Sequence, residues 1–438
     1  MNDSVSARFD EFLDLEKIRQ LVTVTPDALR SLESLDALVA ADTLEKSLKA
    51  IYLPNDFILG FIKEMYAKAA HHSEWLFSNE AEYIARIYNP PATEIFPVCL
   101  TGLAGVGKSQ AISALQKVLP SPFDFECAHF QGCLSLVSYW STSARGKAGG
   151  RQMLADLIGA NGGNASKLLV ECRRRANRDG VSLALLDETQ HINTGQGASK
   201  VTEILLTMAA IGPPMIFVSN YSLIHKLNRR NAEDKHRLLS EPRIMHPDDP
   251  GSGAWNSYIV ECFRVAGDRV KGSVDEFAQE IYRSTFGIKR SVVHILKQAY
   301  IAARGAGREY LTVGDISKAY HCPAYAAYKN DVEILQLIAL QGPKARNRLD
   351  LICPFNLPAT SKSNVVAFVR GERESKVINN VFESSLTEAE RSGLEKIKSD
   401  QTTPPRPKSP RMPRLPEATI DDLASAFLED VSAPPTKP

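Results

Sequence analysis

The segment from Gly102 to Ser109 reads G-L-A-G-V-G-K-S and matches the pattern G-x-x-x-x-G-K-[ST] in full. Glycines in this pattern let backbone N–H groups converge on phosphate oxygens at the start of a helix, whose positive dipole end favours an anion. We expect Lys108 to reach the β- and γ-phosphates and the Ser109 hydroxyl to bind Mg²⁺. The pattern therefore predicts a phosphate-binding loop for ATP. The residues expected to line the nucleotide are Gly102, Ala104, Gly105, Val106, Gly107, Lys108, Ser109 and Gln110.

Two carboxylates follow an apolar run about eighty residues further along the chain. The run Leu183–Leu186 ends in Asp187 and Glu188, as expected of a buried strand with an acidic tip on the strand beside the phosphate loop. We expect Asp187 to bind Mg²⁺ through water, and Glu188 to polarise the attacking water as a general base. A surface turn is the alternative, and the apolar character of the run disfavours it.

A third polar group follows the apolar run Met215–Ser219. The amide of Asn220 could hydrogen-bond both the γ-phosphate and the attacking water, which is the task of a sensor. Asparagine at the end of a strand is also a common turn former, so both interpretations stay open.

Multimeric ATPases take an arginine from a neighbouring subunit to neutralise charge on the γ-phosphate. The segment 228–243 offers Arg229, Arg230, Arg237 and Arg243. Arg243 is the first candidate and Arg237 the second, while a solvated basic surface is an equal alternative. Arg290, at the start of a later helix, is expected to touch the γ-phosphate from the same subunit.

A basic loop extends from Ser141 to Arg151. Its basic residues Arg145, Lys147 and Arg151 stand among small and hydroxyl residues. Such a loop can follow a DNA phosphate backbone without reading bases. It contains no aromatic platform, however, so an ordinary exposed loop fits the same residues.

The elements that position these groups follow from the hydrophobic pattern. Apolar runs over 95–101, 181–187 and 215–219 alternate with helical stretches over 110–119 and 200–210, which indicates a doubly wound α/β sheet. Helical patterns precede it, including 57–70. They also follow it, over 275–284 and 291–303, with Thr312 and Asp315 as capping groups for a third helix.

We therefore divide the chain into six regions. They are a helical N-terminal region (1–90), an α/β ATPase core (91–250), a helical lid (251–340), a C-terminal extension (341–400), a Pro-rich basic linker (401–417) and a terminal helix (418–438). The linker contains many prolines and, from Gln401 to Pro416, no acidic residue, so we expect it to be disordered. The apolar residues from Ile420 to Val431 recur on one helical face. They predict a helix that docks a partner or, alternatively, folds back onto its own chain.

Composition narrows the class of protein. The chain has 438 residues, a net charge of +1 and seven scattered cysteines with no C-x-x-C pair, so we expect no disulfide framework and no zinc site. The N-terminus has no unbroken apolar core, and no apolar stretch is long enough for a bilayer. A cytoplasmic protein without a membrane partner is the expectation.

Together these motifs resemble the AAA+ ATPases, through the phosphate loop, the D-E-x-Q-H strand tip from Asp187 to His191, the sensor strand and the helical lid. Within them the chain looks most like the TnsC and TniB regulators of cut-and-paste transposons. Three further stretches carry this likeness, and they are Leu53–Phe57, Thr207–Pro214 and Asp422–Phe427.

The resemblance implies an ATPase that oligomerises on duplex DNA as a ring or filament. It also implies two protein partners. A target-selector protein would hand over the target site to this ATPase, and the ATPase would recruit or activate a transposase. The arginine region matches only loosely, and the basic loop does not align with DNA-contacting residues. Two alternatives stay open: a helicase loader or replication initiator, and a signalling or defence switch that binds ATP and hydrolyses little.

Overall fold

The structure is a computed structural model of the whole chain. It describes residues 7–9, 14–30, 32–92, 95–126, 133–147, 149–192, 197–267, 269–342, 348–356 and 363–387, together with 390, 392 and 393. The chain divides into two compact units, residues 1–372 and 373–438. The elements below belong to the first unit, except that α17 (Ser363–Ser385) runs across the boundary.

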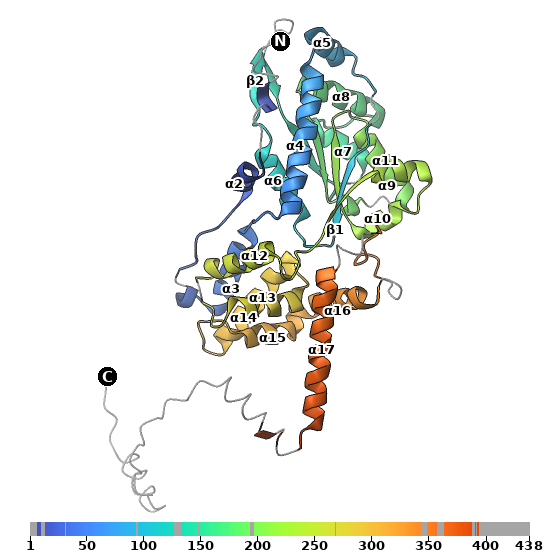
Figure 1. Cartoon of the computed structure of the whole chain (residues 1–438). Coiled ribbons are helices and arrows are strands. Elements are labelled where there is room, and N and C mark those ends of the chain that lie inside the picture. Colours follow the sequence, from blue (N-terminus) through green and yellow to red (C-terminus); the bar gives the residue numbers. More distant parts are fainter. Residues whose placement is uncertain are drawn as a thin grey trace, which may run out of the picture. The chain divides into compact units, whose positions relative to one another are not determined.

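A five-stranded parallel sheet forms the centre of the first unit (Figure 1). Across the sheet its strands are β4 (Tyr139–Ser143), β5 (Leu183–Asp187), β6 (Met215–Asn220), β1 (Val98–Gly102) and β7 (Glu241–Met245). A separate antiparallel pair is formed by β2 (Phe123–Glu126) and β3 (Cys133–Leu136). The expected doubly wound α/β class is confirmed.

Two details of the sheet differ from expectation. β6 lies between β1 and β5, so the acidic strand tip is one strand further from the phosphate loop than we predicted. The edge strands β4 and β7 were missed, and the region predicted as a basic loop begins inside β4. Both strands are short and carry polar residues, because an edge strand is not buried on all sides and needs no continuous apolar run.

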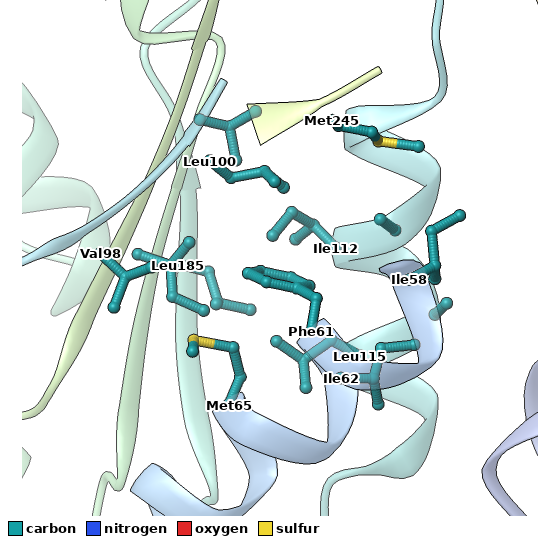
Figure 2. Packing of buried hydrophobic residues seen from close by; sticks show 14 of the residues in the cluster. Ile58, Phe61, Ile62, Met65, Val98, Leu100, Ile112, Leu115, Leu185 and Met245 are labelled. Atoms are coloured by element: carbon teal, nitrogen blue, oxygen red, sulfur yellow. The ribbon is translucent and has the colours of Figure 1, made fainter. Parts of the chain in front are cut away.

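One face of the sheet is covered by α2 (Leu15–Val22), α4 (Asp56–Phe77) and α6 (Lys108–Val118). Figure 2 shows Phe61 and Met65 of α4 packed with Val98 and Leu100 of β1 and with Leu185 of β5. Side chains alternate along a strand, so every second residue of β1 and β5 points to this layer.

The intervening strand residues point to the opposite face. There Cys99 and Phe217 pack with helices α7 (Gly150–Leu157), α8 (Ala165–Arg178), α9 (Gly197–Ala209), α10 (Tyr221–Leu227) and α11 (Ala232–Leu239). Outside this layer, α5 (Glu80–Tyr88) packs on α8 and on the β2–β3 pair. The central strands are thus buried on both faces.

A helical lid follows the sheet and has its own core around Trp255. Its helices are α12 (Gly253–Val265), α13 (Val274–Thr285), α14 (Lys289–Gly305) and α15 (Val313–Tyr320). The predicted capping group is confirmed, because Thr312 and Asp315 form a reciprocal capping box at α15.

The N-terminal helix α3 (Ala37–Ala50) packs in this lid core rather than on the sheet. Lys297 of α14 binds Asp42 over 2.5 Å and Glu45 over 2.6 Å. Hydrogen bonds from Lys297 and Lys49 lower the pKa of Glu45 to about 2. Residues before the sheet therefore complete the lid.

Helix α16 (Ala326–Gln341) ends the lid, and residues 348–356, which we name the return segment, lie back against the core. Leu351 is buried in the core cluster. The ring of His225 hydrogen-bonds the Ile352 carbonyl oxygen over 2.9 Å. The return segment thus binds α10, the helix that follows Asn220.

The remaining short helices are η1 (Ala7–Phe9), η2 (Leu32–Ser34), η3 (Thr189–His191) and η4 (Pro323–Tyr325). None of the described helices is both long and apolar enough to cross a membrane. The proline-rich linker and the terminal helix predicted for 418–438 lie outside the described residues. The six domain bounds stay a prediction.

Candidate active site

The loop after β1 has a backbone that its glycines make possible. Gly105 and Gly107 have φ values of +85° and +109°, a region that side chains with a Cβ rarely adopt. A Cβ on Gly102 would lie 2.3 Å from the carbonyl oxygen of Met245, and one on Gly105 would lie 2.8 Å from Cβ of Arg290. Helix α6 begins at Lys108, directly after this loop. The loop therefore directly precedes a helix N-terminus, a place that favours an anion.

Lys108 lies under this loop and is buried. Its ammonium group donates hydrogen bonds to the carbonyl oxygens of Gly102 (3.0 Å) and Leu103 (2.7 Å) and to Oδ1 of Asn220 (2.8 Å). Burial lowers the pKa of Lys108 to about 8, against the opposing effect of Glu188. The lysine is thus held by three protein oxygens.

The ends of β5 and β6 bring the polar groups together, because parallel strands place their carboxyl ends at one edge of the sheet. Asp187, Glu188 and Asn220 all line the cleft at this edge. The backbone N–H of Glu188 donates to Oδ1 of Asp187 over 2.7 Å. Ser109 lines the same cleft and is exposed.

This donor set fits Mg²⁺, which binds through one or two carboxylates, water and substrate phosphates. The Ser109 hydroxyl and the Asp187 carboxylate would hold the ion. When bound, it would neutralise charge on the phosphates.

The cleft has a volume of about 690 Å³, a size suited to a nucleotide. The phosphate loop, the strand ends, the lid and α3 all contribute to its walls. The α3 end of the cleft and the lid contribute apolar and aromatic side chains that could pack on a purine ring, and these include Leu48, Ile51, Tyr258 and Val293. No sequence pattern indicated them, because α3 and the lid meet only through tertiary packing.

Arg290 lies in the cleft at the start of α14. Its backbone N–H donates to the Gly105 carbonyl oxygen over 3.2 Å, which joins the lid to the phosphate loop. Arg145 of the basic loop also lines the cleft, although we had assigned it to DNA. Neither guanidinium has a hydrogen-bond or ion-pair partner among the described residues, so both are available to phosphate.

The arginines of the segment 228–243 do not line the cleft among the described residues. Arg243 lies in β7 and binds Glu64 of α4 through two hydrogen bonds of 2.9 and 2.5 Å. Arg237 pairs with Glu233, and Arg230 pairs with Asp234. Arg229 is exposed at the end of α10.

The other predicted DNA contacts lie outside the cleft. Lys147 forms an ion pair with Asp156, which uses part of the charge of the basic loop. Arg151 is exposed in the first turn of α7. Of the three basic residues predicted to contact DNA, Arg145 therefore lines the cleft, whereas Lys147 and Arg151 do not.

No family model and no curated protein matches the chain. Among solved structures it is similar to the ADP form of the Aeropyrum pernix ORC2 protein, with 16% identity, 68% of this chain and 84% of that chain covered, and a TM-score of 0.39. It is similar to Drosophila ORC bound to DNA, with 14% identity, coverage of 88% and 86%, and a TM-score of 0.38. Domain III of the Thermotoga maritima replication initiation protein DnaA shows 11% identity, coverage of 55% and 88%, and a TM-score of 0.33.

At these scores the fold assignment rests on the topology of the chain itself. The glycine-rich loop follows the strand beside edge strand β7, Asn220 ends the next strand, and the acidic tip ends the one after. A helical lid then covers the cleft. The fold is thus a P-loop α/β core with a helical lid, the architecture that the sequence pattern predicted.

Proposed function

We propose that this chain is a regulatory ATPase that binds Mg²⁺-ATP in the cleft and assembles on duplex DNA. One observation carries the proposal. The chain supplies Lys108, Asp187 and Glu188 at its own cleft, whereas none of the arginines from 228–243 lines it. A site that contains a water-activating group and lacks this arginine is suited to completion by a neighbouring subunit.

The structure leaves Arg229 as the candidate most accessible to a neighbour. Its side chain is exposed, whereas Arg243 is engaged by Glu64 and Arg237 by Glu233. A mixing experiment tests each arginine. Glu188→Gln subunits carry inactive sites but intact arginines, so they should restore turnover to subunits that carry the relevant Arg→Ala substitution.

We further propose that the ATPase regulates transposition by linking target selection to transposase recruitment. The resemblance of Leu53–Phe57 and Thr207–Pro214 to the TnsC type supports this more specific function. The predicted terminal helix would dock the transposase. Deleting Ile420–Pro438 should then abolish recruitment while hydrolysis continues.

A helicase loader or replication initiator is the second candidate. It shares the same nucleotide site and differs in its partner. The solved structures named above include replication proteins of this kind, but likeness at these scores shows no function. Co-purification with a replicative helicase, in place of a transposase, would favour this candidate.

A steady-state ATPase assay with and without duplex DNA tests the shared core of both candidates. Turnover should rise when DNA is added and should be lost in Glu188→Gln. Electron microscopy should show multimers only with ATP and DNA together. Turnover that Glu188→Gln leaves unchanged, or monomers under all conditions, would contradict the proposal.

A further inference from the structure

Residues 246–252, which we name the hinge, connect strand β7 of the sheet to helix α12 of the lid. Asp248 in this hinge is buried, with 8% of its surface exposed. A carboxylate that loses its water needs hydrogen bonds or a counter-charge in return. The partners of Asp248 therefore show which elements the hinge is fixed to.

One partner of Asp248 comes from the N-terminal region. Asn55 caps α4, because its Oδ1 accepts a hydrogen bond from the backbone N–H of Ile58 over 3.0 Å. Its Nδ2 donates to Oδ1 of Asp248 over 2.7 Å. Asn55 belongs to the stretch Leu53–Phe57, which packs against the lid core at its first residue and against the sheet core at its last. This stretch therefore joins the two cores and the hinge.

The second partner of Asp248 comes from the lid. Nζ of Lys289, the first residue of α14, lies 3.5 Å from Oδ2 of Asp248, and both side chains are largely buried. The same ammonium group lies over the ring of Tyr258, 5.3 Å from its centroid. Oδ2 of Asp248 accepts no hydrogen bond among the described residues. The charge of Lys289 is therefore what compensates this buried oxygen.

The turn before α14 also rests on the backbone of the hinge. Gly287 has a φ of +71°, and a Cβ there would lie 2.9 Å from the carbonyl oxygen of Asp248. The turn thus approaches the hinge more closely than a residue with a side chain allows. Three residues later, the backbone N–H of Arg290 donates to the Gly105 carbonyl oxygen over 3.2 Å. The start of α14 is therefore fixed both to the hinge and to the loop after β1.

We propose that Asp248 and Asn55 are positioning residues that set the orientation of α14 and thereby place the guanidinium of Arg290 at the cleft. This inference rests on the proposed ATPase function, in which Arg290 contacts the γ-phosphate. Asp248 acts through Lys289, the neighbour of Arg290 in the chain, and Asn55 holds Asp248 from the start of α4. A displacement of about 1 Å can cost about a hundredfold in rate, so loosening the start of α14 should lower kcat.

The first test compares Asp248→Asn and Lys289→Met with wild type in the ATPase assay. Each substitution removes one charge of the pair, so kcat should fall about tenfold. The KM for ATP should change little in Asp248→Asn, because Asp248 does not line the cleft among the described residues. Lys289→Arg keeps a cation opposite Asp248 and should lose less kcat than Lys289→Met. Thermal unfolding shows whether each variant folds.

The decisive test repeats Asp248→Asn in an Arg290→Ala background. If Asp248 acts through Arg290, no guanidinium is left to be misplaced. The double variant should then turn over about as fast as Arg290→Ala alone. A general structural effect would instead lower kcat by the same factor in both backgrounds, and that result would overturn the inference. If Asp248→Asn does not fold, Lys289→Met takes its place in this comparison.

Asn55→Asp separates the hinge contact from the helix cap. Aspartate caps a helix about as well as asparagine does, but here it places a like charge against Asp248 and removes the amide donor. The kcat should therefore fall as it does in Asp248→Asn. Asn79→Asp is the matched control, because Asn79 caps α5 by accepting from the backbone N–H of Ala81 over 2.9 Å. Helix α5 packs on α8, so this variant should keep the kcat of wild type.

Two further results would contradict the inference. One is a wild-type kcat in folded Asp248→Asn and Asn55→Asp, and the other is an equal loss of kcat in Asn55→Asp and Asn79→Asp. Failure of the proposed function looks different. In that case wild type itself shows no turnover, or Glu188→Gln turns over as wild type does.

Discussion

Nζ of Lys108 donates a hydrogen bond to Oδ1 of Asn220 over 2.8 Å. This bond joins the start of α6 to the end of β6, where Asn220, the predicted sensor, lies. A phosphate in the loop would compete for the same ammonium group. Its arrival therefore both engages the lysine and frees the amide to bind the γ-phosphate or the attacking water.

ATP affinity should fall as the pH rises above 8. Burial lowers the pKa of Lys108 in the free protein to about 8, and bound phosphate would raise it again by favouring the charged form. Above pH 8 the free lysine is mostly neutral, so binding must take up a proton. The affinity should then fall about tenfold per pH unit, measured by titration calorimetry with a slowly hydrolysed ATP analogue.

Lys108→Met provides the control for this pH dependence. It lacks the titrating group, so its weaker affinity should be nearly constant between pH 7.5 and about 9.5. An affinity of the wild type that stays constant over the same range would show that the ammonium group is not the group that takes up the proton.

The return segment should stabilise the core through Leu351. This side chain is 9% exposed and packs in the same cluster as Tyr221 and Ile288. Leu351→Ala should lower the free energy of unfolding by about 2–3 kcal/mol, measured by urea denaturation. Leu349→Ala, two residues away and 37% exposed, should lower it by less than about 1 kcal/mol. Equal losses would mean that the segment does not pack against α10.

Local pattern was enough to predict the polar groups that gather at the cleft. Asp187 and Asn220 each end a buried strand, Lys108 begins the helix that follows another, and parallel topology then forces these ends together. The strands themselves were visible because they are buried on both faces. Edge strand β7 was not, since Pro242 and Arg243 interrupt any apolar run.

Contacts between elements far apart in the chain could not be predicted from the sequence. Helix α3 has an amphipathic pattern that would suit either the sheet or the lid, and only tertiary contacts place it beside α14. The ion pair between Arg243 and Glu64 joins residues 179 positions apart. No spacing rule connects such pairs, so the partner of Arg243 could not be anticipated.

Arg290 should contribute to hydrolysis more than to ATP binding. It lies at the junction of the lid and the phosphate loop, with its guanidinium free for the γ-phosphate. Because charge on the γ-phosphate grows in the transition state, Arg290→Ala should lower kcat about tenfold to a hundredfold. The affinity for ATP should change less. Single-turnover and equilibrium-binding measurements separate the two effects.

Arg304→Ala is the matched control on the same helix. Arg304 lies at the other end of α14 and donates to the Leu32 carbonyl oxygen over 3.0 Å, away from the cleft. It should keep a kcat close to wild type. A similar loss of kcat in both variants would assign the effect to the stability of the lid, not to the guanidinium of Arg290.

Arg145 and Arg151 should separate nucleotide effects from DNA effects. Arg145 lines the cleft beside the acidic strand tip, whereas Arg151 is exposed on α7. Arg145→Ala should weaken ATP binding or turnover in the absence of DNA and leave DNA affinity unchanged. Arg151→Ala should weaken DNA binding and reduce the slope of log affinity against log salt by about 1.

Because Lys147 is paired with Asp156, we expect Lys147→Ala to weaken DNA binding less than Arg151→Ala. Equal loss of DNA affinity in Arg145→Ala and Arg151→Ala, with ATP binding unaffected, would mean that the loop works as one DNA-binding surface, as its composition first indicated.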